Sequence, residues 1–191
     1  FDANKTYIAT IQLGVITTTG DQEGEVVSEK EVLLNEAQLE ETLKKFIGDV
    51  TQIPPMYSAL KFEGKPLYEY AREGIEIERK SRQIKIYDIK LIKIEGSIIT
   101  IEVSCSKGTY IRTLGEDIGQ TLGCGAHLKG LERTQTGNFQ LSEAITIEAL
   151  EGMSMVLREK ALIPIDALLD DLSSIKLTGA ETEAIKKGQH I

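Results

Sequence analysis

The sequence of 191 residues is long enough for one substantial domain with a buried core plus a short appendage. Its 41% hydrophobic content, 27% charge and lack of any long apolar run are typical of a soluble globular protein and exclude a transmembrane helix. A net charge of -8 argues against a uniformly basic nucleic-acid binder, although seven basic residues against five glutamates between positions 61 and 85 allow a local basic face.

Phe1 is not an initiator residue and no signal-peptide pattern follows it, so we expect the sequence to begin inside a longer protein. Two cysteines are too few for a disulfide scaffold, and the acidic composition favours a reduced, cytoplasmic setting. We interpret Cys105 and Cys124 as small buried hydrophobes. Cys124 and His127 lie three residues apart, but a closed zinc site needs about four ligands, so the sequence predicts no metal.

The first half of the chain alternates between strand and helix signals. Period-two alternation places Tyr7 on a mostly apolar strand face, and Asn35 with Gln38 matches a helix capping box. Pro54 and Pro55 force an extended stretch. In chain order, the predicted elements are a strand over Lys5–Leu13, a loop over 17–24, a short strand near Val26, a helix from Asn35 to Gly48, and a short helix near Leu67 that ends at Gly74.

The second half begins with a predicted hairpin around a Gly96-Ser97 turn. The tail changes character, because Pro164 interrupts a helical pattern and Thr178 with Glu181 forms another capping box. The predicted elements are strands over 83–95, 98–105 and 128–134, and helices over 109–122, from Thr146, over 153–169 and from Thr178 to Gly188. The whole pattern predicts an α+β fold with meandering strands.

The densest local motif is the segment 104–114, where a buried strand passes through a glycine turn into a helix start. Such a junction directs backbone N–H groups and the cations Lys107 and Arg112 at one spot, which suits an anionic ligand. An ordinary turn with two solvated basic side chains fits the same residues, so composition alone leaves both readings open.

Several segments together resemble the TruB family of pseudouridine synthases, in order and spacing, over roughly residues 5–150. The strongest are 53–61 (Ile-Pro-Pro-Met-Tyr-Ser-Ala-Leu-Lys), continuing through 64–74, and 105–112 (Cys-Ser-Lys-Gly-Thr-Tyr-Ile-Arg), followed by 122–128. The opening Lys5-Thr6-Tyr7 is similar to the tyrosine strand of the family. The resemblance implies isomerisation of the T-loop uridine of tRNA, at position 55, to pseudouridine, without cofactor or metal.

The resemblance also implies roles for individual residues. Tyr7 is similar to the tyrosine that stacks on the target base and takes part in proton removal, and Arg112 to the arginine that ion-pairs with the catalytic aspartate. Tyr110 and Leu131 resemble residues that line the uracil pocket. The phosphate contacts that it implies are Lys61, Lys65, Lys107 and Arg133. From the residues alone, core packing or a solvated surface position remains an alternative for each.

The implied architecture is a pseudouridine synthase fold, with a mixed, mainly antiparallel sheet flanked by helices. We expect the C-terminal portion of the catalytic domain at 1–152, a helical connector at 153–172 and the start of a small PUA-type domain at 173–191. The expected partner is the T-stem-loop of tRNA, bound by a monomer in the cytoplasm and away from membranes.

The sequence departs from the family pattern in two places. The Gly-Thr-Leu-Asp-type motif with the catalytic aspartate is absent, and Asp21 stands in a different loop. Glu132 replaces a residue that is often basic in the family. We therefore expect this chain alone to be inactive and the intact protein to be an enzyme. A non-catalytic RNA-binding protein and a structural subunit are the alternatives.

Overall fold

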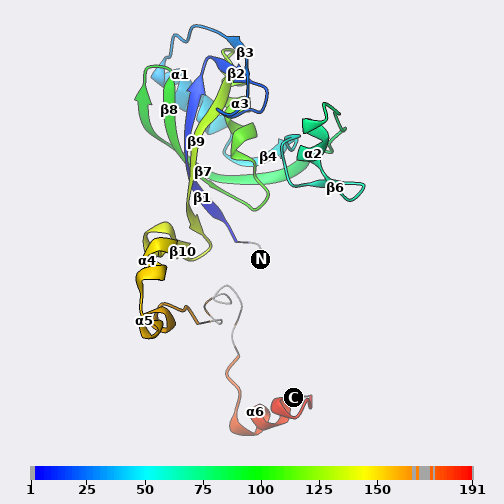
Figure 1. The fold of residues 1–191 in the computed structure, drawn as a ribbon, viewed down its shortest axis with the longest axis vertical. Coiled ribbons are helices and arrows are strands. Elements are labelled where there is room, and N and C mark those ends of the chain that lie inside the picture. The colour runs from blue at the N-terminus through cyan, green and yellow to red at the C-terminus, as the bar shows by residue number, and fades with distance from the viewer. Residues whose placement is uncertain (1–2, 165–166, 168–172, 174, 191) are drawn as a thin grey trace. The chain divides into compact units, whose positions relative to one another are not determined.

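The computed structural model describes residues 3–164, 167, 173 and 175–190, which fall into two compact units, Phe1–Ala144 and Ile145–Ile191. The strands are β1 Lys5–Leu13, β2 Val15–Thr17, β3 Val26–Glu29, β4 Gly48–Gln52, β5 Lys61–Phe62, β6 Lys65–Pro66, β7 Arg82–Glu95, β8 Ile98–Cys105, β9 Ala126–Thr136 and β10 Phe139–Gln140 (Figure 1). The helices are α1 Glu36–Lys45, α2 Leu67–Arg72, the 3-10 turn η1 Leu141–Glu143, α3 Ile111–Thr121, α4 Ile147–Gly152, α5 Met155–Lys160 and α6 Gly179–Lys186.

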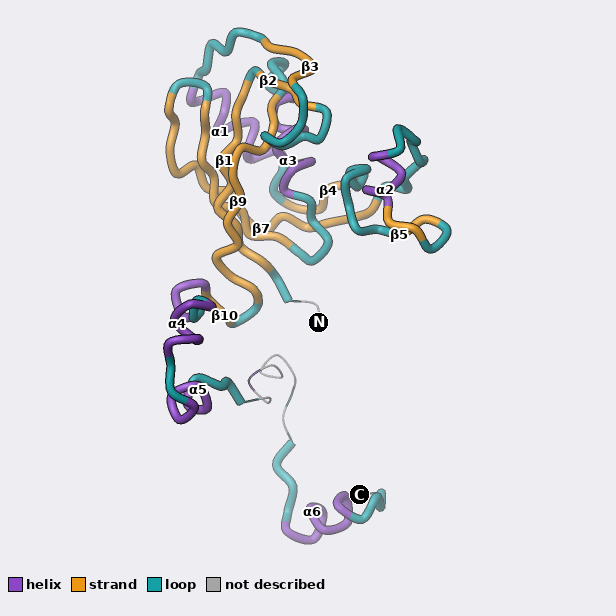
Figure 2. Tube along the Cα trace, in the orientation of Figure 1, coloured by secondary structure: helices purple, strands orange, loops and turns teal. Residues whose placement is uncertain are grey.

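The first unit is built on a six-stranded sheet in the order β10-β9-β1-β8-β7-β4, as far as the chain is described. All of these strand pairings are antiparallel. The short hairpins β2–β3 and β5–β6 lie outside this sheet, and Figures 1 and 2 show β5, β6 and α2 projecting together from the rest of the first unit. The predicted α+β class with a mainly antiparallel sheet is confirmed.

One face of the sheet is covered by α1 and α3. Ala9, Ile11 and Leu13 alternate along β1 and are buried, and they join the apolar residues of β7 and β8 in one core with the helices. The side chain of Asn35 accepts a hydrogen bond from the Gln38 N–H at 3.2 Å, so the predicted cap starts α1. Because Tyr7 continues the alternation of Ala9, Ile11 and Leu13, it lies on the face of β1 that the helices cover.

The structure corrects several expected boundaries. The strands β2, β4, β5 and β6 were not predicted, and the expected helix over 153–169 is shorter, because α5 spans Met155–Lys160 and residues 161–164 are not helical. Residues 165–166 and 168–169 of that expectation lie outside the described residues. The capped helix after Thr178 is confirmed as α6. The division at 152 and 172 stays a prediction, whereas the contacts place the unit boundary after Ala144.

Candidate active site

The first turn of α3 lies at the Tyr7 end of the sheet. A Cβ on Gly115 would lie 3.6 Å from the Ile11 side chain, which places the middle of the helix over the middle of β1. Near the end of the helix, Gly119 approaches Ala126, which pairs with the last residue of β1. The helix therefore runs in the same direction as β1, and its start points toward the end that carries Tyr7.

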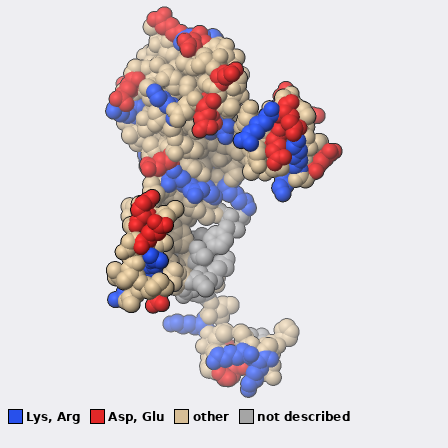
Figure 3. Space-filling view, in the orientation of Figure 1, with Lys and Arg blue, Asp and Glu red and all other residues tan. Residues whose placement is uncertain are grey.

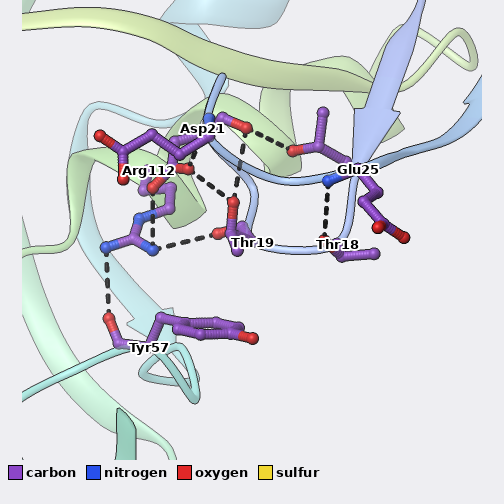
Figure 4. A network of polar contacts seen from close by, with 8 residues as sticks. Thr18, Thr19, Asp21, Glu25, Tyr57 and Arg112 are labelled. Atoms are coloured by element: carbon purple, nitrogen blue, oxygen red, sulfur yellow. Dashed lines mark hydrogen bonds and ion pairs between the residues drawn. The ribbon is translucent and has the colours of Figure 1, made fainter. Parts of the chain in front are cut away.

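Arg112, in the first turn of α3, joins two loops that are distant in sequence (Figure 4). Its Nη1 donates to the Thr19 carbonyl oxygen at 3.1 Å and forms an ion pair with Asp21 Oδ2 at 3.1 Å, while Nη2 donates to the Tyr57 carbonyl oxygen at 3.2 Å. The Arg112 and Asp21 side chains are only 22% and 26% exposed. The planar, multi-donor guanidinium fits this three-way contact, which a lysine cannot reproduce.

Asp21 is the site residue that sequence reasoning missed. Its Oδ1 accepts hydrogen bonds from Thr19 Oγ1 at 2.5 Å and from the Glu23 N–H at 3.2 Å. Backbone hydrogen bonds to Leu128 hold the loop on β9. Asp21 was set aside because it stands in a different loop from the one in which the family carries its catalytic aspartate. A carboxylate in a Thr- and Gly-rich loop just after the tyrosine strand was the available signal.

A second carboxylate near Arg112, besides Asp21, is that of Glu116, which lies one helical turn later on α3. A Cβ on Gly20 would lie 2.6 Å from Glu116 Oε1, so this carboxylate packs directly on the loop that carries Asp21. Burial, followed by the negative charge of Asp117, raises the pKa of Glu116, and Arg112 opposes this rise. The positive charge of Arg112 thus acts on both Asp21 and Glu116.

Tyr7, Leu131 and Arg133 lie on one face of the sheet. Tyr7 pairs with Arg133 and Ala9 pairs with Leu131, and directly opposed residues of antiparallel strands share a face. Tyr7 is half-buried, whereas Leu131 is 49% exposed for an apolar side chain. Burial raises the pKa of the Tyr7 phenol, followed by the effect of Cys105, while Arg133 acts in the opposite direction. Tyr7 is therefore a phenol at neutral pH.

Tyr110 is held by Gln52, a further residue that the sequence did not single out. The Gln52 side chain is 2% exposed; its Oε1 accepts from the Tyr110 N–H at 2.8 Å and its Nε2 donates to the Tyr110 carbonyl oxygen at 3.0 Å. This pair of hydrogen bonds fixes the backbone that precedes Ile111, the first residue of α3. Tyr110 itself is half-buried at this junction.

The predicted basic contacts differ in their surroundings. Lys61 on β5 and Lys107 before α3 are exposed, as is Arg133. Lys65 is engaged within the chain, because its Nζ lies 2.5 Å from Glu73 Oε1 and 4.6 Å from the centre of the Tyr70 ring. The structure brings Arg112, Tyr110, Tyr7, Leu131 and Arg133 to one end of the helix-covered face, whereas Lys61 and Lys65 belong to the β5–β6 hairpin.

Cys124 and His127 contact backbone carbonyl groups. Cys124 Sγ lies 3.3 Å from the Gly125 carbonyl oxygen, and His127 Nδ1 lies 3.0 Å from the Val15 carbonyl oxygen. Within residues 3–164, 167, 173 and 175–190, three or more His, Cys, Asp or Glu side chains nowhere gather as a metal site would require. No helix in the same set is long and apolar enough to cross a bilayer.

Family models match almost the whole chain. The model described as TruB family pseudouridylate synthase, N-terminal domain, matches residues 1–111, and the one described as tRNA pseudouridylate synthase B C-terminal domain matches residues 112–175. The chain belongs to the TruB family. The boundary between the two models falls within α3, so the TruB sequence domains do not coincide with the compact units of the structure.

Curated TruB-family relatives are similar along the full chain. The tRNA pseudouridine synthase B of Chromobacterium violaceum is 51% identical and that of Azoarcus sp. is 50% identical, each over 190 residues. This chain spans only 62% and 63% of their lengths.

Among solved structures, a Cbf5-Nop10-Gar1 complex matches with a TM-score of 0.69 at 27% identity, covering 97% of this chain and 49% of the matched chain. An H/ACA RNP bound to a substrate RNA containing 2′-deoxyuridine matches with a TM-score of 0.54 at 25% identity, covering 84% of this chain and 37% of the other. The architecture is therefore the pseudouridine synthase fold that the sequence predicted.

Proposed function

We propose that the intact protein isomerises the T-loop uridine of tRNA to pseudouridine. In this reaction the N1–C1′ bond of uridine breaks and a C5–C1′ bond forms, while C5 loses a proton and N1 gains one. Atoms and electrons balance within the substrate, so the reaction needs no cofactor. The names of the full-length relatives support this activity, although the chain spans less than two thirds of their length.

The observation that carries the proposal is Arg112. It is three-quarters buried, is fixed by Thr19, Asp21 and Tyr57, and lies at the same end of the sheet as Tyr7. We propose that in the intact protein it also orients a catalytic aspartate supplied by residues outside this chain. A carboxylate beside a guanidinium stays ionised, as a nucleophile or electrostatic partner must.

Tyr7, Tyr110 and Leu131 form the proposed uracil pocket. A uridine inside a folded loop must be flipped out before it can react, and an aromatic face with apolar walls compensates for the stacking that is lost. The exposed Leu131 side chain fits such a wall. Because its pKa is raised, Tyr7 is a neutral phenol that can stack on the uracil ring. To remove a proton from the substrate, Tyr7 must first give its own phenol proton to an acceptor.

The proposed partner is the T-stem-loop of tRNA, bound by a cytoplasmic monomer. The phosphate contacts proposed are Lys61, Lys65, Lys107 and Arg133. Phe62 on β5 and Tyr70 on α2 pack edge to face beside Lys65, with ring centres 6.1 Å apart, so the hairpin and α2 together offer aromatic and cationic groups.

The test is pseudouridine formation in a T-stem-loop RNA by the intact protein and its Arg112→Lys variant. Lysine keeps the charge but cannot bridge three acceptors, so kcat should fall by about 10²-fold or more. Arg158→Lys is the matched control, because Arg158 also binds two backbone carbonyl groups, in the second unit. RNA binding by the intact protein without any pseudouridine would support the non-catalytic alternative. Residues 1–191 alone should form none.

A further inference from the structure

The start of α3 is fixed by a residue from outside the helix. Tyr110 is the N-cap residue of α3 and its backbone is extended, but its side chain makes no capping hydrogen bond. An aromatic residue is a poor N-cap, because it carries no oxygen close to its own backbone. Instead, the buried Gln52 amide accepts from the Tyr110 N–H at 2.8 Å and donates to the Tyr110 carbonyl oxygen at 3.0 Å. Gln52 therefore sets the place at which the helix begins.

The segment that follows Gln52 contacts α3 a second time. Gln52 is the last residue of β4, and two prolines keep the chain after it extended. Further along this segment, the Tyr57 carbonyl oxygen accepts the hydrogen bond from Arg112 Nη2 (Figure 4). Residues 52–57 thus hold the backbone of Tyr110 and the side chain of Arg112 together.

The contacts of Arg112 depend on where the helix begins, since Arg112 follows Tyr110 by less than one helical turn. Its guanidinium reaches Thr19, Asp21 and Tyr57 at 3.1–3.2 Å. A displacement of the helix start by about 1 Å is enough to break such contacts, because N–H···O hydrogen bonds span only about 2.7–3.2 Å. The same displacement would move the Tyr110 side chain, which belongs to the proposed uracil pocket.

Gln52 itself is 2% exposed, so its side chain does not reach a ligand on the surface. The proposed phosphate contacts lie elsewhere. Figure 3 shows Lys and Arg side chains on the surface of the lobe formed by β5, β6 and α2, and Lys61 and Lys65 belong to its hairpin. Loss of the Gln52 amide leaves these cations in place. It should therefore affect the chemical step and not the capture of the RNA.

We propose that Gln52 is a positioning residue for uridine isomerisation, which acts by fixing the backbone of Tyr110 and, through the helix start, the guanidinium of Arg112. This rests on the proposed function, because it needs a uridine in the pocket. Gln52 does not touch the substrate. Its effect on rate arises because a misplacement of reacting groups by about 1 Å can cost 10²-fold, even when the substituted residue is far from the chemistry.

The experiment compares three variants of the intact protein. Gln52→Met keeps nearly the length of glutamine but makes neither hydrogen bond, and Gln52→Asn keeps the amide but is one methylene group too short. Ile99→Ala is the stability control, because Ile99 is fully buried and pairs with Ile11, toward the end of β1 away from Tyr7. The measurements are the single-turnover rate of pseudouridine formation in a T-stem-loop RNA at saturating enzyme, and the Kd for that RNA. Denaturant unfolding identifies the variants that are folded under the assay conditions.

For Gln52→Met we expect the single-turnover rate to fall by roughly tenfold or more with an unchanged Kd. Gln52→Asn should also be slower than the parent protein, and it keeps the comparison possible if Gln52→Met does not fold. Ile99→Ala should be less stable but react at the parent rate. Folded Gln52 variants that react as fast as Ile99→Ala, or that lose affinity for the RNA instead of rate, would overturn the positioning role while the proposed function stands. A parent protein that forms no pseudouridine would reject the proposed function and this role with it.

Discussion

Gly119→Ala tests how closely α3 must pack on the sheet. A Cβ at position 119 would lie 2.4 Å from both the N and Cβ atoms of Ala126, and from the carbonyl carbon of Gly125. These are mostly backbone atoms that cannot swing aside, so the helix must lift by roughly 1 Å to restore ordinary contact distances. Such overpacking costs about 1–3 kcal/mol or more. The better helix propensity of alanine offsets about 1 kcal/mol of this.

Gly115→Ala is the matched control on the same helix face. Its added methyl group would lie 3.6 Å from Ile11, an ordinary contact, so it should keep the propensity gain and stabilise the protein by up to about 1 kcal/mol. Denaturant unfolding followed by circular dichroism gives the two free energies of unfolding. The propensity gain is common to both variants, so we expect them to differ by the overpacking cost of about 1–3 kcal/mol or more. Equal stability of the two would show that α3 does not pack on β9 as described.

Two further predictions concern residues around Arg112. Gln52→Leu leaves the Tyr110 N–H and carbonyl oxygen without their buried partner, so the free energy of unfolding should fall by about 2–4 kcal/mol in chemical denaturation. A change within about 0.5 kcal/mol would contradict a stabilising role for this pair of hydrogen bonds. The raised pKa of Glu116 means that the folded state holds this proton more tightly than the unfolded state, so the stability linked to it falls as pH rises from the ordinary carboxyl range through the raised pKa. Glu116→Gln should therefore be more stable than the parent protein at neutral pH and show a flatter stability profile over that window, and an unchanged profile would contradict the burial of its carboxyl group.

Strong local patterns explain which parts of the fold could be predicted. Local signals were enough to predict the strands β1, β7 and β8 from their alternation and the start of α1 from the cap at Asn35, because each signal depends only on neighbouring residues. By contrast, β4 has the weak strand sequence Gly-Asp-Val-Thr-Gln and forms because it pairs with β7. Tertiary pairing of this kind leaves no period-two signal in the sequence.

The site could be predicted only in part for the same reason. The residues named from motifs, Tyr7, Tyr110 and Arg112, lie at one end of the sheet, but their functional roles remain predictions. Asp21 and Gln52 were missed, since each reaches the site through a contact with a residue more than fifty positions away. A side chain that is polar in a loop or at a strand end gives no local sign of such a contact.

The contacts of Arg112 also constrain the order in which the protein can fold. Its partners Thr19 and Tyr57 are 93 and 55 residues away along the chain, so the loop-closure entropy of two long segments must be overcome before this junction forms. Local hairpins such as β7–β8 can form without it. The site should therefore be among the last regions to become protected from hydrogen exchange during refolding, after the strands that carry it have paired.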